Sequence, residues 1–171
     1  METWDALRAR RNVRQFAERV IPEADLERIL EAGRRAPSAS NRQLWDFVVV
    51  TGRKRLAELS GVFQGARHVA GSAATIALVV PASEDARSRD LIQFDLGQAT
   101  MCLMLAAADL GVGSGHAGVH DQDLARRLLG FPADHVCALL IAFGYPADHP
   151  LRPVNRPARR PFEQVVHREQ W

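Results

Sequence analysis

The spacing of apolar residues along the chain predicts helices that alternate with strands. Between Pro22 and Pro37, apolar residues recur every three or four positions, which predicts a helix with one face toward a core. Residues 45–51, WDFVVVT, form a run rich in β-branched side chains, which is typical of a buried strand. The apolar runs at 73–80 and 136–143 are of the same kind and predict two further strands.

The longest predicted helix runs from Leu91 to Leu110. Its second half is apolar on every face, so we expect it to lie in the middle of the domain or of an oligomer. Gly111 is expected to end it in a left-handed conformation. Shorter helices are predicted at 3–8 with Thr3 as N-cap, at 53–60, and at 121–129 with Asp121 as N-cap.

The last part of the chain has a different pattern. Five prolines fall between residues 146 and 161, too closely spaced for a helix, so the tail is expected to be extended and to wrap a neighbouring subunit. The length of 171 residues suits a single domain, residues 1–171. The order of the elements predicts an α+β fold with a mixed central sheet flanked by helices.

Composition narrows the classes of function. Apolar residues make up 47% and charged residues 25% of the chain, as in ordinary globular proteins. The net charge of +2 and the lack of interleaved aromatic residues argue against a nucleic-acid partner. No segment has the length of a membrane span or the pattern of a signal peptide, so a soluble cytoplasmic protein without a membrane partner is expected. The two cysteines are interpreted as core residues, with no metal site.

A glycine-rich segment, GVGSGHAG at 111–118, has the spacing of a dinucleotide fingerprint in the wrong context. That fingerprint needs a strand before it and a helix directly after it, whereas here the longest helix precedes it. Its glycines could leave backbone N–H groups free to approach a planar ligand, or could simply form a helix stop and a tight turn. His116 and His120 are not on a helix, so a metal pair is not expected.

Two polar clusters are candidates for ligand binding. The segment RRNVRQF at 10–16 could clamp a phosphate with its guanidinium groups, or could be a solvated surface, and its spacing alone does not choose. The loop PSASN at 37–41 offers small donors and acceptors that suit an uncharged ligand such as a flavin ring, although ordinary loops favour the same residues.

Taken together, five stretches in this order resemble the FMN-dependent nitroreductase family. They are 10–16 (RRNVRQF), 36–45 (APSASNRQLW), the long helix running into 111–114, 143–146 (FGYP) and 161–167 (PFEQVVH). The resemblance covers nearly the whole chain. It implies a homodimer with two FMN sites at the interface and a domain-swapped C-terminal tail from each subunit.

The resemblance also implies an activity. FMN would take a hydride from NADH or NADPH in one half-reaction and pass the electrons to a nitroaromatic, quinone or activated alkene in the next, with no side chain performing the redox step. His116 is the candidate proton donor to the product. The alternatives are an FMN storage or sensing protein, or a family variant that fragments flavin or dehalogenates its substrate.

Individual contacts follow from the matched positions. The FMN phosphate would meet Arg10, Arg11, Asn12 and Arg159, with Arg160 as the alternative in the tail. Arg14 would approach the pyrimidine edge, the backbone of His116, Ala117 and Gly118 would face the ring, and the partner chain would supply Arg35, Ser38, Ala39 and Asn41. The sequence departs from the family at Asn12, where Ser is usual, at Leu44, where Pro is usual, and in a connection of about ten residues before the long helix, which implies an open site.

Overall fold

A four-stranded antiparallel sheet forms the middle layer of the computed structural model, which describes residues 1–171. The strand order is β1-β2-β4-β3, with β1 at Asp46–Val50, β2 at Ala74–Pro81, β3 at Gly113–Ala117 and β4 at His135–Gly144. The α+β class is confirmed. The sheet is antiparallel in all its named strands rather than mixed, and the only parallel pairing is the single bridge between Asn12 and Ser114.

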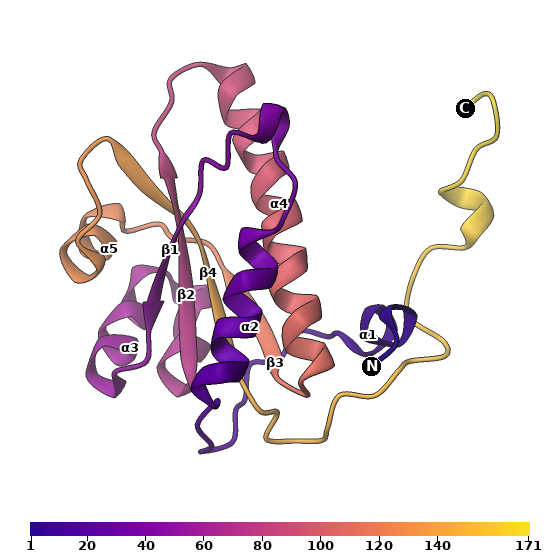
Figure 1. The fold of residues 1–171 in the computed structure, drawn as a ribbon, viewed down its shortest axis with the longest axis horizontal. Helices are drawn as coiled ribbons and strands as arrows, with labels where there is room; N and C mark the ends of the chain where they lie inside the picture. The colour runs from indigo at the N-terminus through magenta and orange to yellow at the C-terminus, as the bar shows by residue number, and fades with distance from the viewer.

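Helices cover both faces of this sheet (Figure 1). α2 (Glu23–Arg34) and α4 (Ala86–Asp109) pack on one face, and α3 (Arg53–Leu59) and α5 (Gln122–Leu129) pack on the other. In β2, Ile76 and Leu78 point to the first face, while Ala77 and Val79 point to the second. Because both faces are buried, β2 reads as one continuous apolar run without alternation.

The long helix α4 lies deep in the fold. Ala99, Leu103 and Ala107 are fully buried, and a Cβ at Gly33 of α2 would lie 2.6 Å from Leu103 Cδ2, so the two helices are in close contact. By length and composition alone α4 could cross a bilayer, a test that core helices of soluble proteins also pass. Its packing identifies it as a core helix.

α4 begins five residues earlier than the sequence indicated. Asp85 is its N-cap, and the Asp85 carboxylate accepts the N–H of Ser88 at 2.7 Å. The connection from β2 is therefore only residues 82–85, shorter than the expected ten. At the other end, Gly111 adopts φ +73°, so the left-handed conformation expected there is confirmed.

The smaller helices follow the predictions with one exception. Asp121 caps α5 by accepting the N–H of Leu124 at 2.8 Å, as expected. α1 spans Thr3–Ala9, but Glu2 is its N-cap and no side chain bonds to its first turn, so the expected Thr3 cap is wrong. Four short 3₁₀ segments complete the fold: Ala39–Asn41, Ser60–Val62, Gln64–Gly71 and Phe162–Gln164.

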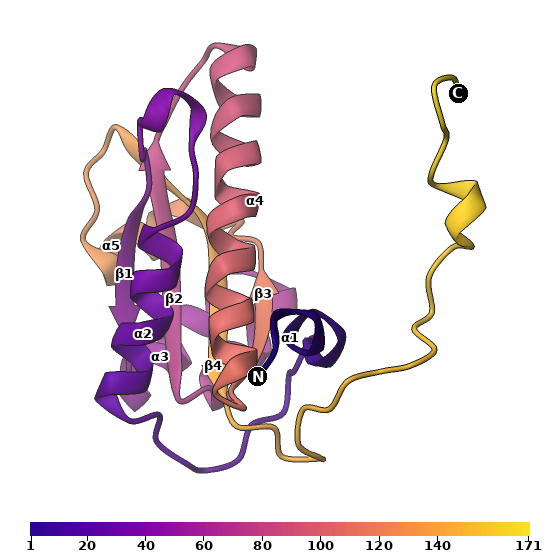
Figure 2. The ribbon, with the colours of Figure 1, turned by 45° about the vertical axis from the view of Figure 1, so that its right-hand side comes forward.

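The C-terminal tail separates from the body of the protein, as Figures 1 and 2 both show in yellow. Leu151 is its last buried residue, and every residue from Arg152 to Trp171 is exposed. Near its start the tail passes α1, where Val154 N–H donates to the carbonyl of Arg8 at 3.1 Å. The tail is extended apart from the turn at Phe162–Gln164, in agreement with the prediction from its prolines.

Candidate functional site

The arginine segment lies directly along the edge strand β3. Val13 N–H donates to the carbonyl of Ser114 at 2.8 Å, which holds residues 10–14 beside the strand. A Cβ at Gly113 would lie 2.6 Å from Val13 Cγ2, and a Cβ at Gly115 would overlap the Val13 carbonyl oxygen. These glycines therefore allow the two segments to approach closely.

This contact corrects the interpretation of the glycine-rich segment. Residues 113–117 form a strand, where the sequence suggested a turn, because the pairing partner β4 and the arginine segment are both distant in sequence. Gly113 and Gly115 face Val13 and are not open to a ligand. Gly118, just beyond the strand, has open space in front of its Cα, as does Gly111 at the end of α4.

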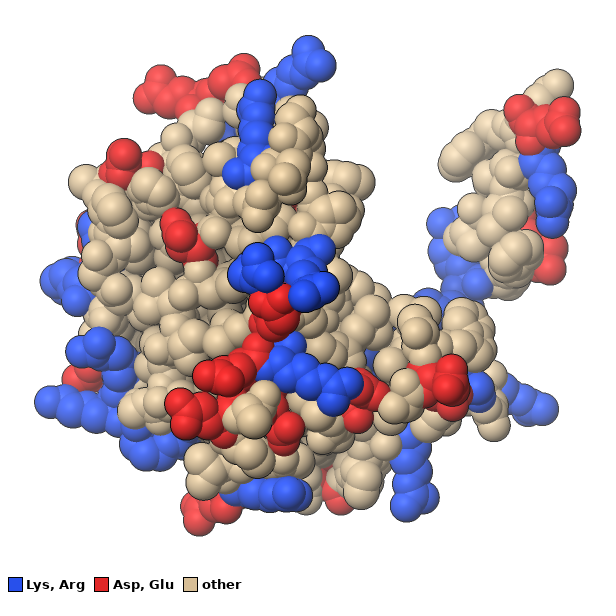
Figure 3. All heavy atoms as spheres, viewed as in Figure 1, with Lys and Arg blue, Asp and Glu red and all other residues tan.

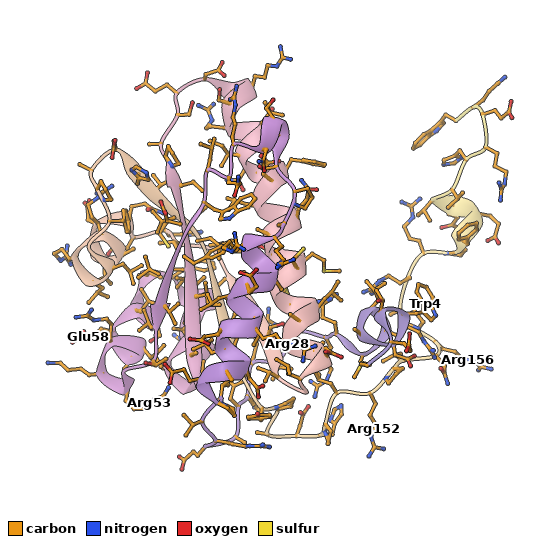
Figure 4. The ribbon with its side chains drawn as sticks, viewed as in Figure 1. Trp4, Arg28, Arg53, Glu58, Arg152 and Arg156 are labelled. Carbon is orange, nitrogen blue, oxygen red and sulfur yellow. The ribbon has the colours of Figure 1, made fainter.

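A cavity of about 520 Å³ lies between the arginine segment, α1 and the tail. Figure 4 shows Trp4 of α1 and Arg156 of the tail at this corner of the molecule. The cavity is lined by Trp4, Leu7, Arg8, Arg10, Arg11, Asn12, Val154, Asn155, Pro157, Ala158 and Arg159. It thus brings together the four residues predicted to meet the phosphate, and leaves out Arg160, which bonds to the carbonyl of Gln164.

The guanidinium groups in this cavity differ in their partners. Arg11 donates to the Asp148 carboxylate at 2.7 Å and to the carbonyl of His149 at 2.9 Å. Arg10 and Arg159 form no ion pair, and the buried Nε of Arg10 has no hydrogen-bond partner. Two cations without counter-ions make the cavity suited to an anion.

A second cavity, of about 340 Å³, adjoins the first at Arg10 and runs along α4. It is lined by Arg10, Gln93, Leu96, Gly97, Thr100, Met101, Met104, His116, Ala138 and Leu139. Gly97 leaves open space where a side chain would stand. The buried Thr100 hydroxyl has no partner. The cavity is therefore mostly apolar, with polar groups still free to bind a ligand.

The α4 residues of this cavity were not among the predicted site residues. Gln93, Gly97, Thr100 and Met104 recur at intervals of four, three and four, which places them on one helix face. The signal was present, because three small or polar residues at that spacing interrupt an apolar helix. From the sequence, the second half of this helix is expected to be buried on every face, and no ligand contact is predicted from its first half, where Gln93 and Gly97 lie.

The loop assigned to the partner's site lies elsewhere. Ala39 N–H donates to both carboxylate oxygens of Asp95 on α4, at 3.1 and 3.2 Å. Residues two apart on a helix differ by about 200° around its axis, so Asp95 lies almost opposite Gly97 and the second cavity. Arg35 donates to Glu31 at 2.6 Å. Within one chain, Arg35, Ser38, Ala39 and Asn41 therefore line neither cavity.

The remaining predicted residues are close to the second cavity or at the surface. His116 lines the cavity, Ala117 is buried in β3, and Gly118 follows it. Arg14 is exposed and lines neither cavity. On the face shown in Figure 3, basic and acidic side chains are intermixed. Glu31 of α2 pairs with both Arg34 and Arg35 at the end of this helix.

Two local environments away from the cavities shift pKa values strongly. Hydrogen bonds from Arg34 and Arg35 lower the pKa of Glu31 to about 2. Burial raises the pKa of Cys137 to about 12, which keeps it a neutral thiol and agrees with the prediction of a core residue.

The Arg11–Asp148 ion pair makes the start of the tail sensitive to acid. The hydrogen bond from Arg11 lowers the pKa of Asp148 from 3.8 to about 2. A depressed pKa means that the stabilising contribution is present above about pH 4 and is lost as the pH falls through 2. We expect the difference in Tm between the wild-type protein and Asp148→Asn to be constant above about pH 5 and to shrink steadily below about pH 4, measured by thermal melts from pH 6 to pH 2. A difference that stays constant down to pH 2 would contradict the pairing.

Known proteins resemble this chain in both sequence and structure. The sequence matches the profile of the Nitroreductase family over residues 7–66 and 62–145. A protein of Archaeoglobus fulgidus, provisionally described as an NADH dehydrogenase/NAD(P)H nitroreductase, is 32% identical over 95% of this chain and 94% of its own.

Solved structures share the fold. A Clostridium acetobutylicum protein, provisionally described as an NADH oxidase, superposes with a TM-score of 0.85 at 22% identity and covers 98% of this chain and 100% of its own. An FMN-dependent nitroreductase of Clostridium difficile superposes with a TM-score of 0.84 at 22% identity, over 97% of this chain and 98% of its own.

Proposed function

Because this chain belongs to the nitroreductase family, it is a flavin-dependent oxidoreductase that uses NAD(P)H, and we propose that its flavin is FMN. The observation that carries the proposal is the pair of cavities that meet at Arg10. One contains two guanidinium groups without counter-ions, those of Arg10 and Arg159, which suits a phosphate. The other is mostly apolar with a few free polar groups, which suits a planar ring.

In the first cavity the residues would bind the phosphate. Arg10 and Arg159 supply two positive charges, and Asn12 adds an amide donor. Arg11 would add a third charge, although it also pairs with Asp148. Together these groups come from the two ends of the chain, so phosphate binding would fix the start of the tail against α1.

In the second cavity the residues would hold and orient the ring. The open face at Gly97 gives room for a flat group beside α4, and the Thr100 hydroxyl is free to bond to a ring heteroatom. The backbone of His116, Ala117 and Gly118 would line the other side, with His116 as proton donor to the product. Arg14, which lines neither cavity, would approach the pyrimidine edge from outside and stabilise negative charge on the reduced ring.

When bound, FMN supplies the two-electron chemistry: it accepts a hydride from NADH or NADPH and passes the electrons to a small acceptor such as a nitroaromatic, quinone or activated alkene. The protein contributes binding, orientation and charge. The connection of only four residues at 82–85 leaves no inserted helix to roof the cavities, which favours an open site. A cytoplasmic location stays a prediction from the sequence.

We further propose a homodimer with FMN at its interface. The loop at 38–43 and the second cavity lie on opposite faces of α4, so this loop would serve the site of the partner protomer. Phe94 on α4 is 69% exposed, and the tail carries several exposed apolar residues. Exposed apolar surface on these two elements is suited to contact with a second copy.

The visible spectrum of the purified protein tests this function directly. We expect yellow protein with flavin absorbance, released as FMN on denaturation, and rapid anaerobic bleaching on mixing with NADH or NADPH in a stopped-flow instrument. Bleaching that takes minutes would instead favour a storage or sensing protein. A colourless monomer that does not bind added FMN would contradict the proposal.

A further inference from the structure

Asp95 on α4 is the only acidic side chain that the fold buries. It is 5% exposed and forms no ion pair with any basic group of the chain. Its carboxylate accepts the N–H of Ala39 with both oxygens, at 3.1 and 3.2 Å, and Gln98 Nε2 donates to it at 3.4 Å. Burying a carboxylate without a cation is costly. Its place in the core therefore calls for a specific role.

The loop that Asp95 holds has an unfavourable backbone. Ser40, Asn41 and Gln43 have φ values of 52°, 55° and 52°, in the left-handed region that side chains disfavour. Ser38 Oγ accepts the N–H of Gln43 at 3.0 Å, and Gln43 Nε2 donates to Asn41. These bonds are all internal to the loop, so they do not fix it to the rest of the fold.

The bond between Ala39 and Asp95 is the only hydrogen bond from residues 38–43 to another element. It therefore fixes where the loop stands relative to α4. The opposite face of the same helix, with Gln93, Gly97 and Thr100, lines the second cavity. One helix thus shapes a cavity with one face and positions a strained loop with the other.

We propose that Asp95 is a positioning residue for flavin binding, whose carboxylate holds the loop at 38–43 in the form that enters the partner protomer's site. The inference rests on the proposed function, because it requires FMN at a dimer interface. Asp95 itself would touch no FMN. Its effect would pass through the Ala39 amide to the small polar groups that the loop presents across the interface.

Two substitutions at this position separate the hydrogen bond from the bulk of the side chain. Asp95→Ala removes the acceptor and should weaken FMN binding at least tenfold, measured by fluorescence titration of the apoprotein. Asp95→Asn keeps an acceptor oxygen and should bind FMN within threefold of the wild type.

Leu56→Ala is the matched control. Leu56 is a fully buried residue of α3 on the other face of the sheet, so this substitution should lower Tm and leave the FMN Kd unchanged. Equal affinity in Asp95→Ala and the wild type, or equal weakness in both Asp95 variants, would overturn the proposal.

Mixed dimers test whether the loop acts across the interface. Asp95→Ala and Arg10→Ala subunits are co-expressed with different tags, and the heterodimer is purified through both tags. In this heterodimer, one site combines the intact Arg10 of the Asp95→Ala subunit with the intact loop of the Arg10→Ala subunit. The other site carries both substitutions. We expect half of the sites in this heterodimer to bind FMN with wild-type affinity. If the loop served its own chain, no site would recover, and the proposal would be overturned. A wild-type protein that binds no FMN would instead overturn the proposed function.

Discussion

The Arg10→Ala variant should bind FMN roughly 100-fold more weakly than the wild type. Arg10 is the only residue that lines both cavities, and its buried Nε has no partner in the chain. Hydrogen bonds to charged groups contribute about 1.5–3 kcal/mol each, and 1.4 kcal/mol corresponds to a tenfold change in affinity. Loss of two such bonds to a phosphate dianion, each at the lower end of this range, therefore gives about two orders of magnitude. Equilibrium titration of the apoprotein with FMN, followed by flavin fluorescence, measures the change.

Two further variants control this result. Arg28 lies on α2 (Figure 4) and pairs with Asp109 at 2.8 Å at the protein surface. Arg28→Ala removes one positive charge of the same kind away from both cavities, and should leave the FMN Kd within twofold. Arg10→Lys keeps the charge but loses the planar fork, so it should fall between the wild type and Arg10→Ala. An unchanged Kd in Arg10→Ala would remove this residue from the phosphate site.

Removal of residues 152–171 should abolish both the dimer and FMN binding. The tail exposes Phe162 by 63% and Trp171 by 102%, and no residue beyond Leu151 is buried in its own chain. Arg159, one of the two unpaired cations of the phosphate cavity, is lost with it. We expect the truncated chain to sediment as a monomer in analytical ultracentrifugation and to be colourless after addition of FMN.

The truncated chain should still fold, because the three-layer body lies entirely before residue 152. A cooperative thermal transition with native far-ultraviolet circular dichroism checks this. A full-length Phe162→Asp variant is a milder test, since it adds a charge at one exposed apolar position and should raise the dimer dissociation constant without removing Arg159. A truncated protein that stays dimeric would show that the tail does not hold the subunits together.

The buried strands could be predicted from the sequence, and the edge strand could not. β2 and β4 are covered by helices on both faces, so their residues form apolar runs that are recognisable without any tertiary information. β3 consists of Gly113–Ala117, GSGHA, which has neither β-branched residues nor alternation. Its composition is set by the close approach of Val13, a contact between residues about 100 positions apart. Such a contact leaves no local periodicity.

The candidate site was predicted in its motifs but not in its geometry. The arginine segment and the tail residue Arg159 were identified from their resemblance to a family, and residues 10–12 of the segment line the first cavity together with Arg159. The α4 face was missed because the apolar second half of this helix predicts burial on every face. The loop at 38–43 lies on the far side of α4 because it is bonded to Asp95. No sequence pattern indicates that Asp95 is buried.

The packing of β3 against Val13 also has a practical consequence for protein engineering. Gly113 and Gly115 tolerate no added methyl group, and Ser114 and Ala117 are buried. His116, in contrast, is exposed toward the cavity. A mutational library aimed at a new acceptor range should therefore randomise position 116 and leave the other four residues of the strand unchanged. Most substitutions at those four positions would prevent the strand from forming.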